Sequence, residues 1–510
     1  MNPDLFALLT AVAAGDALAL PQRPVVRTRI AASTAFGLAS LSGAVYATGF
    51  PPLSWTIAPW LALVPLLVAC AALSPLRAAM AGMCWAVTAA IGVAWFLPGM
   101  LSGYFGLSPV PSWLATVAVV GGLHGLSVSA YAAWVAWLVR RRAANPVLLA
   151  GGWLVCEFAR ANGGLSSPWA LAAYSQLRWT PMIQIADVAG PYGIGLLIAG
   201  VNACAAASMV PALRGRRPVL ATVTIGAAVL GALLYGEWRL GQSVGDGEPV
   251  RVAVVQGGLS STENASRYVA MTTVVQADLI VWPEHAIAAY LEEPSTERDA
   301  VLGITSGGRT DLVLGAPHYE PSASGTRYHN SAYLVRDGRI AGRYDKTRLV
   351  PFAETTTYTP GPGTFVLPAT ALRVGVLLCV EGMFPDLVRQ ATGQGAELLL
   401  NLSNDGWFGH PVPARHQLEI ATLRAVESRR YLVRAAATGF SAVIDPYGRT
   451  LTESGFDTRE VLTATVRASH VRTPYQRWGD AFAWVVIAAV VGASLRSLLV
   501  RKPSNRRRLA

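Results

Sequence analysis

The sequence is poor in charged residues and in cysteine, and both shortages limit what the protein can be. Only 14% of its 510 residues are charged, whereas 53% are hydrophobic, which excludes an ordinary soluble protein. Acidic residues are nearly absent between residue 30 and about residue 240. Of the five cysteines, Cys379 alone lies in a stretch of ordinary globular composition, so no disulfide is expected there.

Signals for secretion and for metal binding are also missing. No basic segment precedes the apolar residues at the N-terminus, and Asp4 and Asp16 interrupt them, so a cleaved signal peptide is not expected. His329, His410 and His416 have neither the spacing nor the Cys and Asp neighbours of a metal site. We therefore predict no metal and no cofactor.

Long apolar segments make up much of the chain. A helix needs about 20 apolar residues to cross the ~30 Å hydrocarbon core of a bilayer. The segment that contains Glu157 and Arg160 is the most polar of these, and such groups usually face the interior of a helix bundle. We predict eight membrane spans, at residues 30–48, 55–73, 78–98, 112–139, 147–163, 184–210, 218–237 and 481–500.

The positive charges predict how these spans are oriented. With eight spans, every basic cluster falls on one side, which the positive-inside rule assigns to the cytoplasm. The opposite loops, at about 49–54 and 99–111, contain no charged residue. The net charge of +11 therefore matches anionic lipid headgroups, and we expect no nucleic-acid partner. The clusters contain Arg23, Arg27, Arg29, Arg77, Arg140 to Arg142, Arg214, Arg216, Arg217, Arg501, Lys502 and Arg506 to Arg508.

Composition and orientation together divide the chain into five parts. Both termini are predicted to be cytoplasmic, and the globular part is predicted to face outward. The parts are a cytoplasmic N-terminal segment (1–29), a membrane domain with seven helices (30–240), an extracytoplasmic domain (241–478), a final transmembrane helix (479–500) and a basic cytoplasmic tail (501–510).

The extracytoplasmic part alternates short β-rich runs with helical stretches. Nearly continuous apolar runs indicate strands that are buried on both faces, as in a layered α/β fold. Pro413 to about Arg434 is predicted to form one helix, because its apolar residues recur at helical spacing. The predicted strands are 250–255, 278–282, 311–315, 331–335, 373–378 and 397–401.

Three residues of this part have the side chains that acyl transfer needs. Cys379 ends a strand-like run, and its thiolate would be a nucleophile. Glu284 can take the thiol proton and return it to a leaving group. Lys346 supplies positive charge where an oxyanion develops, and the backbone N–H of Val380 is a natural second donor. Each residue also has an ordinary structural alternative, such as a small buried hydrophobe for Cys379.

The residues around these three form more specific motifs. They are Val281-Trp-Pro-Glu284, Tyr344-Asp-Lys346 with Leu349 to Glu354, Cys379-Val-Glu381, and Asn401-Leu-Ser-Asn-Asp-Gly-Trp-Phe-Gly409. Together they resemble the nitrilase superfamily of carbon–nitrogen hydrolases. In combination with eight spans, and with Trp169 to Gln176 in the membrane part, the chain is similar to the apolipoprotein N-acyltransferases.

The resemblance implies an αββα nitrilase sandwich as the extracytoplasmic catalytic domain. It implies Glu284 as general base, Lys346 as stabiliser of the transition state and Cys379 as the nucleophile that accepts the acyl group. It also implies that Glu354 orients the lysine or assists proton transfer, and that Glu381 supports the site. The chain departs from the family pattern at Val380, where an aromatic residue is common, and in a short 354–379 segment.

Other polar and aromatic residues have two interpretations each. Trp407 and Phe408 are candidate contacts for an acyl chain or headgroup, and aromatic core packing is the alternative. Four polar residues of the membrane part are candidates for headgroup binding, or for ion pairs within the bundle: His124, Glu157, Arg160 and Asp187.

The predicted enzyme transfers an acyl chain from a phospholipid to the N-terminal α-amine of a diacylglyceryl-modified apolipoprotein, through a thioester on Cys379. Its predicted place is the bacterial cytoplasmic (inner) membrane, with several passes and the catalytic domain on the extracytoplasmic face. One alternative is a membrane-tethered carbon–nitrogen hydrolase that passes the acyl group to water, although a single helix would suffice as its tether. Another is a lipid- or lipoprotein-binding scaffold on a nitrilase-like fold, which would not need Glu284, Lys346 and Cys379 together.

Overall fold

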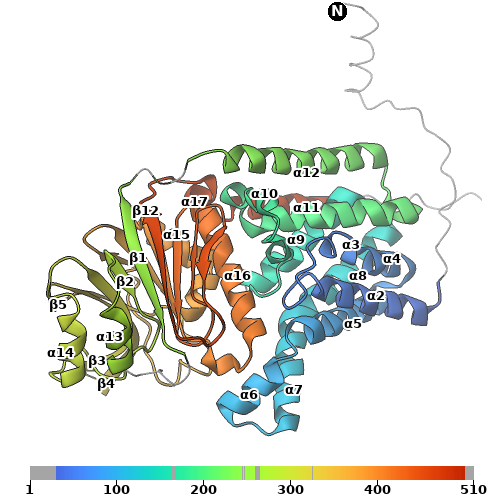
Figure 1. Ribbon diagram of the computed structural model, residues 1–510. Coiled ribbons are helices and arrows are strands. Elements are labelled where there is room, and N and C mark those ends of the chain that lie inside the picture. The colour runs from blue at the N-terminus through green and yellow to red at the C-terminus, as the bar shows by residue number, and fades with distance from the viewer. Residues whose placement is uncertain are drawn as a thin grey trace, which may run out of the picture.

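The computed structural model describes residues 30–499, except 163–167, 244, 246, 259–264 and 324. The predicted N-terminal segment (1–29) and basic tail (501–510) lie outside the described residues. The described chain has a helical part and a β-sandwich that lie against each other, with α12 (Pro218–Leu240) running along one side of the helical part (Figure 1).

Each of the eight apolar segments predicted to span a membrane is helical over most of its length. Among the described residues, four helices are long and apolar enough to cross a membrane: Pro75–Val93 (α5), Ala186–Met209 (α11), α12 and Ala481–Leu499 (α18). The remaining segments form shorter or interrupted helices. The other bounds are α2 (Ala32–Ala47), α3 (Pro59–Ala62), α4 (Val64–Ala72), α5 (Pro75–Val93), α6 (Leu97–Phe105), α7 (Pro109–Val120), the π-helical turn η1 (Gly121–Gly125), α8 (Leu126–Arg141), α9 (Pro146–Asn162), α10 (Thr180–Ile183), α11 (Ala186–Met209) and α18 (Ala481–Leu499).

Backbone chemistry explains two of the interruptions. Pro65 lacks an N–H group and follows the break between α3 and α4, so the helical ladder cannot continue there. Asn202 of α11 bridges this break, because its side chain accepts from the N–H of Leu63 at 2.8 Å and donates to the carbonyl of Pro59 at 2.9 Å. Within α11, Gly190 has a φ of 60° just before Pro191, which kinks the helix.

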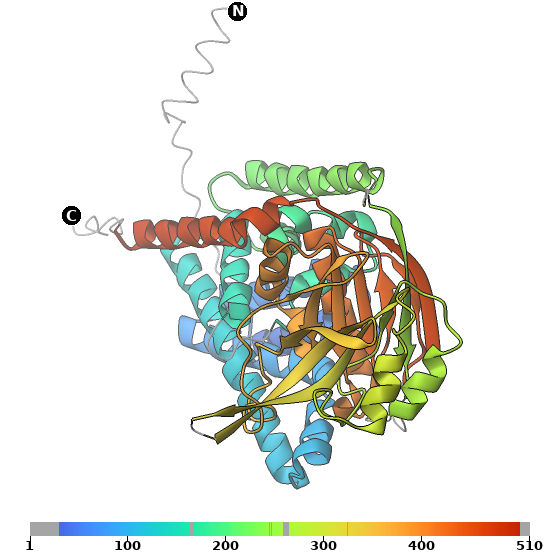
Figure 2. The same ribbon diagram turned by 90° about the vertical axis from the view of Figure 1, so that its left-hand side faces the viewer.

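The second part of the chain is a sandwich of two six-stranded sheets, with strand orders β12-β1-β2-β3-β4-β5 and β11-β10-β9-β8-β7-β6 (Figure 2). Strands β1, β2 and β3 are parallel, as are β7, β8 and β9. The strands are β1 (Pro249–Gln256), β2 (Leu279–Val281), β3 (Asp311–Ser322), β4 (Gly325–Arg336), β5 (Arg339–Asp345), β6 (Val366–Pro368), β7 (Arg373–Leu378), β8 (Leu398–Ser403), β9 (Leu432–Ala436), β10 (Ala442–Ile444), β11 (Thr450–Glu453) and β12 (Glu460–Arg467).

Helices cover the outer face of each sheet. In β1, Val252 and Val254 belong to the core between the sheets, whereas Ala253 and Val255 pack under α13 (Ala265–Thr272) and α14 (Thr296–Gly303). This alternation is what a strand buried on both faces requires. The helices α15 (Pro385–Gly393) and α16 (Pro411–Ser428) lie on the other sheet, and α16 faces the helical part (Figure 1). The predicted layered α/β fold is confirmed.

The predicted helix from Pro413 to about Arg434 is wrong at its end. Helix α16 stops at Ser428, Arg429 has a φ of 51°, and β9 begins at Leu432. The guanidinium of Arg429 binds Asp187 of α11 at 2.8 Å. It also donates to the side-chain oxygen of Gln184 at 2.5 Å. This buried contact with the helical part takes Arg429 out of the helix.

Three of the four polar residues singled out in the membrane part, Glu157, Arg160 and Asp187, form ion pairs, and His124 is hydrogen-bonded to Arg160. Asp187 also binds Arg239 of α12 at 3.0 Å. Arg160 lies 3.5 Å from Glu157 and 2.9 Å from Nδ1 of His124. Arg160 further donates to the carbonyl of Trp169 at 2.8 Å, so these groups hold neighbouring segments together.

Candidate active site

The candidate site lies where parallel strands of the two sheets end. Glu284 follows β2, Cys379 follows β7 and Asn404 follows β8, and all three line one cavity of about 540 Å³. The carboxyl ends of parallel strands are a common place for sites, because loops converge there. Lys346 enters the same cavity from the end of β5.

Glu284 is buried and accepts three hydrogen bonds. One carboxylate oxygen accepts from Lys346 Nζ at 3.1 Å and from Asn330 Nδ2 at 2.8 Å. The other accepts from the backbone N–H of Asn404 at 3.0 Å. Burial raises the pKa of Glu284, but the Lys346 ammonium and the Asn330 amide outweigh it, so the pKa lies below its ordinary value. The carboxylate is therefore ionised at neutral pH.

Lys346 is held between two carboxylates. Its Nζ lies 3.1 Å from Glu284 and 2.7 Å from Glu354, and the side chain is only 1% exposed. Burial lowers the pKa of Lys346, but the negative charges of Glu284 and Glu354 outweigh burial, so the net shift is upward. The lysine is a fixed positive charge in the cavity.

Glu354 is the third member of the ion-paired group that also contains Glu284 and Lys346. It accepts from Lys346, from Asn330 Nδ2 at 3.0 Å and, through its other oxygen, from the N–H of Val350 at 2.8 Å. Its position next to Lys346 allows it to orient the ammonium. Glu354 also lines the cavity, so a bound molecule can reach it.

Cys379 lies at a sharp turn between β7 and the 3-10 helix η5 (Cys379–Met383). Its φ of 50° is unusual for a residue other than glycine and is a form of backbone strain that occurs at functional sites. Burial, and then the negative charge of Glu284, raise the pKa of the Cys379 thiol to about 12. The thiol therefore keeps its proton until a base removes it.

Glu381 does not line the cavity; instead, it joins two parts of its wall. One oxygen accepts from the backbone N–H groups of Thr347 and Arg348, at 2.8 and 2.9 Å. The other accepts from Tyr344 Oη and from the N–H of Leu378, each at 2.7 Å. The carboxylate thus ties the segment after Lys346 to the turn that carries Cys379.

A second, apolar cavity of about 210 Å³ adjoins the first inside the helical part. Trp407 lines both cavities, and Phe408 lines the apolar one. Their rings stack with centroids 4.3 Å apart. Tyr104 of α6 lines the polar cavity, so the helical part contributes to its wall. Thus, of the aromatic pair predicted as a possible substrate contact, Trp407 lies between the two cavities and Phe408 lies beside it on the apolar one.

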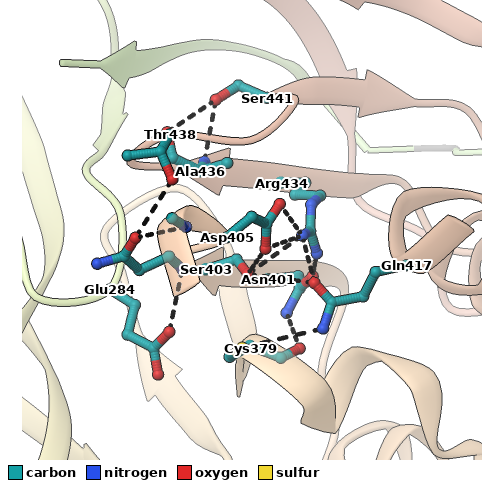
Figure 3. A network of polar contacts seen from close by, with 12 residues as sticks. Glu284, Cys379, Asn401, Ser403, Asp405, Gln417, Arg434, Ala436, Thr438 and Ser441 are labelled. Carbon is teal, nitrogen blue, oxygen red and sulfur yellow. Dashed lines mark hydrogen bonds and ion pairs between the residues drawn. The ribbon is translucent and has the colours of Figure 1, made fainter. Parts of the chain in front are cut away.

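Some residues of the site could not be predicted from the sequence. Asn330 lies inside β4 and binds both Glu284 and Glu354, but it belongs to none of the four sequence motifs of the nitrilase resemblance. Gln417, which lies behind the cysteine in a buried polar network, was not predicted either (Figure 3). Asn401, which donates to the carbonyl of Cys379, belongs to the motif at 401–409. Within the described residues, no three His, Cys, Asp or Glu side chains are grouped to hold a metal ion.

Comparisons with known proteins match both parts of the chain. The family model for the N-terminal domain of apolipoprotein N-acyltransferase matches residues 42–204, and that for carbon-nitrogen hydrolases matches residues 248–475. A nitrilase-superfamily structure from Saccharomyces cerevisiae is similar, with 22% identity and a TM-score of 0.37, over 44% of this chain and 92% of that one.

Two curated relatives extend the match over most of the chain. The apolipoprotein N-acyltransferase of Geobacter metallireducens is 32% identical over 89% of this chain and 94% of its own. That of Gloeobacter violaceus is 30% identical over 94% of this chain and 95% of its own. The family predicted from the motifs is thereby confirmed, and the chain belongs to the apolipoprotein N-acyltransferases.

Proposed function

We propose that the protein moves an acyl chain from a phospholipid to the N-terminal α-amine of a diacylglyceryl-modified apolipoprotein, with Cys379 carrying the chain in between. The observation that carries this proposal is the pairing of two cavities. One contains Glu284, Lys346 and Cys379, and the other is apolar and reaches into the helices. An ester between a polar headgroup and an acyl chain matches such a pair of environments.

In the first step, Glu284 takes the proton of the Cys379 thiol while the sulfur attacks the ester carbonyl of the phospholipid. The carbonyl oxygen becomes an oxyanion, which the Lys346 ammonium and the N–H of Val380 stabilise. The carbon–oxygen bond then breaks, and Glu284 returns the proton to the departing oxygen. The products are a lysophospholipid and a thioester on Cys379.

In the second step, the α-amine of the apolipoprotein attacks the thioester carbonyl. Glu284 takes a proton from the amine, and the same two donors stabilise the second oxyanion. The carbon–sulfur bond breaks, and the thiolate recovers a proton from Glu284. An amide forms and the free thiol returns, so no metal or cofactor is consumed.

The supporting residues have separate roles in this scheme. Glu354 orients Lys346, since its contact with Nζ, at 2.7 Å, is the shorter of the two carboxylate contacts. Glu381 keeps the lysine and cysteine segments together through the five groups that donate to it. Trp407 and Phe408 would contact the acyl chain where it passes from the polar into the apolar cavity.

The proposed setting is the bacterial cytoplasmic membrane, crossed eight times. Both termini would lie in the cytoplasm and residues 241–478 on the outer face, in the five-part division predicted from composition. Support comes from the exposed apolar side chains of α12 and α18: Val219, Val485 and Leu499 are 74%, 70% and 82% exposed. Exposed apolar side chains along a long helix are what contact with lipid would require.

Intact mass measurement of the purified full chain tests the proposed function. Incubation with a defined diacylphospholipid should add the mass of one acyl chain, and a diacylglyceryl-cysteine peptide should then remove it as an amide. Cys379→Ala should gain nothing, whereas Cys84→Ala, which alters a cysteine of the helical part, should behave as the wild type. Discharge to water but never to the peptide would favour the hydrolase. Failure of all phospholipids to form an adduct would favour a binding scaffold.

A further inference from the structure

A buried polar network lies behind Cys379, on the side away from Glu284 (Figure 3). At its centre is Arg434 of β9, whose side chain is fully buried and pairs with Asp405 at 2.9 Å. The same guanidinium donates to the side-chain oxygens of Asn401 and Gln417. A buried charge in such a network is costly to disturb, which makes Arg434 a rigid anchor.

The anchor determines which way the Gln417 amide points. The oxygen of Gln417 accepts from Arg434 Nη2 at 2.8 Å. A guanidinium has donors only, so the amide cannot turn its nitrogen toward Arg434. The nitrogen therefore faces the opposite way, where it lies 3.9 Å from the sulfur of Cys379 and 3.9 Å from that of Met383. The direction of the N–H toward the sulfur thus follows from the chemistry of the neighbours.

Arg434 orients the amide of Asn401 in the same way, toward the backbone of Cys379. The side-chain oxygen of Asn401 accepts from Arg434, so its nitrogen is free to donate to the carbonyls of Cys379 and Leu377, at 3.1 and 3.2 Å. These bonds hold the residue that has a φ of 50°. One guanidinium thus orients two amides, of which one contacts the sulfur and the other the carbonyl of the same residue.

We propose that Gln417 is a positioning residue for the nucleophile, which holds the Cys379 sulfur in place and donates an N–H to it as the thiol loses its proton. This inference rests on the proposed role of Cys379. The thiol proton moves to Glu284, and the sulfur electron pair forms the new bond to carbon. The N–H of Gln417 stays intact throughout and makes its strongest contact while the sulfur is negative.

Alkylation of Cys379 by iodoacetamide tests this without any lipid. The rate follows the thiolate fraction, and peptide-level mass spectrometry separates Cys379 from the four other cysteines. Gln417→Met removes the donor and should lower the rate about tenfold at each pH from 7 to 10. Gln417→Glu keeps a partner for Arg434 but turns a carboxylate oxygen toward the sulfur, so its rate should fall further.

Gln256→Met is the matched control. Gln256 is also fully buried, and its oxygen accepts from Ser441 and Ser454, whereas its nitrogen donates to the carbonyl of Gly455. Its alkylation rate should stay near the wild-type value. A purely structural Gln417 would lower the melting temperature and leave the pH–rate curve unchanged.

Wild-type alkylation rates in folded Gln417→Met and Gln417→Glu would overturn the proposal. Gln417→Glu retains an oxygen that accepts from Arg434, so the test can still be made if the methionine variant does not fold. Because alkylation needs no acyl donor, failure here is distinct from failure of the proposed function. The latter would appear as wild-type protein that is alkylated at Cys379 but gains no acyl chain.

Discussion

The two cavities that meet at Trp407 are lined by opposite kinds of side chain. The sandwich part contributes three charged groups, Glu284, Lys346 and Glu354, that bind one another. The cavity in the helical part is lined by alanines and aromatic rings, with Arg160 and His124 among the few polar groups. Under the proposed function, this difference means that the sandwich supplies the chemistry and the helices supply room for an acyl chain.

Removing the charge from the polar cavity should have the largest effect. Lys346→Met leaves the carboxylates of Glu284 and Glu354 without their shared cation and removes a donor for the oxyanion. Acyl-enzyme formation should slow by about 10³-fold. Arg348→Met, which changes a half-exposed cation two residues away, should slow it little. Equal losses in the two variants would show that the charge of Lys346 has no special role.

Breaking the buried ion pair between the helical part and the sandwich should have a smaller effect than Lys346→Met, and this effect should be a loss of stability. Asp187→Ala leaves the buried Arg429 unpaired at the contact between α11 and the sandwich, so the unfolding free energy should fall by about 3 kcal/mol. The comparison is Asp278→Ala, which breaks the exposed pair with Arg251 and should cost less than about 1 kcal/mol. Thermal unfolding of the purified proteins measures both. Equal costs would mean that the buried pair does not hold the halves together.

Filling the apolar cavity should have a smaller and more selective effect. Ala90→Phe places a ring into the cavity, and overpacking of this kind should slow acylation by a long-chain phospholipid about tenfold. Acylation by a short water-soluble ester should hardly change, because it needs only the polar cavity. Val87→Phe, on the exposed face of the same helix, is the control. Equal slowing of both donors would remove the distinction between the cavities.

A change of pH near neutrality should have the smallest effect on acyl-enzyme formation. Glu284 has a lowered pKa, so it stays ionised as the pH falls below the ordinary range of a carboxylate. Its ion pair therefore contributes stability above the unfolded-state pKa, and this is lost as the pH falls through the folded-state pKa. Since the pKa of Cys379 is about 12 and that of Lys346 is raised, neither group titrates near neutrality. Acyl-enzyme formation should thus change little between pH 5.5 and 8, whereas a midpoint near pH 6.5 would contradict the lowered pKa.

The sequence predicts the parts of the site that lie at strand ends. Glu284 and Cys379 each close an apolar run, and such runs are visible without any knowledge of the partner strands. The layered fold follows from the same runs. Membrane helices are visible for a similar reason, although the breaks at Leu63 and Gly190 depend on single residues and their neighbours.

Residues whose role depends on a distant partner could not be predicted. Asn330 meets Glu284 only through the register of β4 within its sheet. Gln417 faces the cysteine because Arg434, on another element, turns its amide. The helix that was expected to reach Arg434 ends early because Arg429 binds Asp187, which lies 242 positions away in the sequence. The pattern of neighbouring residues along the sequence does not show which distant residues will be in contact in the fold.

Locating the acyl group on the enzyme tests the central claim most directly. The full chain would be incubated with a defined diacylphospholipid, digested and analysed by mass spectrometry before and after treatment with neutral hydroxylamine, which cleaves thioesters. Our account predicts one acyl chain on the peptide that contains Cys379, released by hydroxylamine. An acyl chain on another residue, or one on this peptide that resists hydroxylamine, would contradict it.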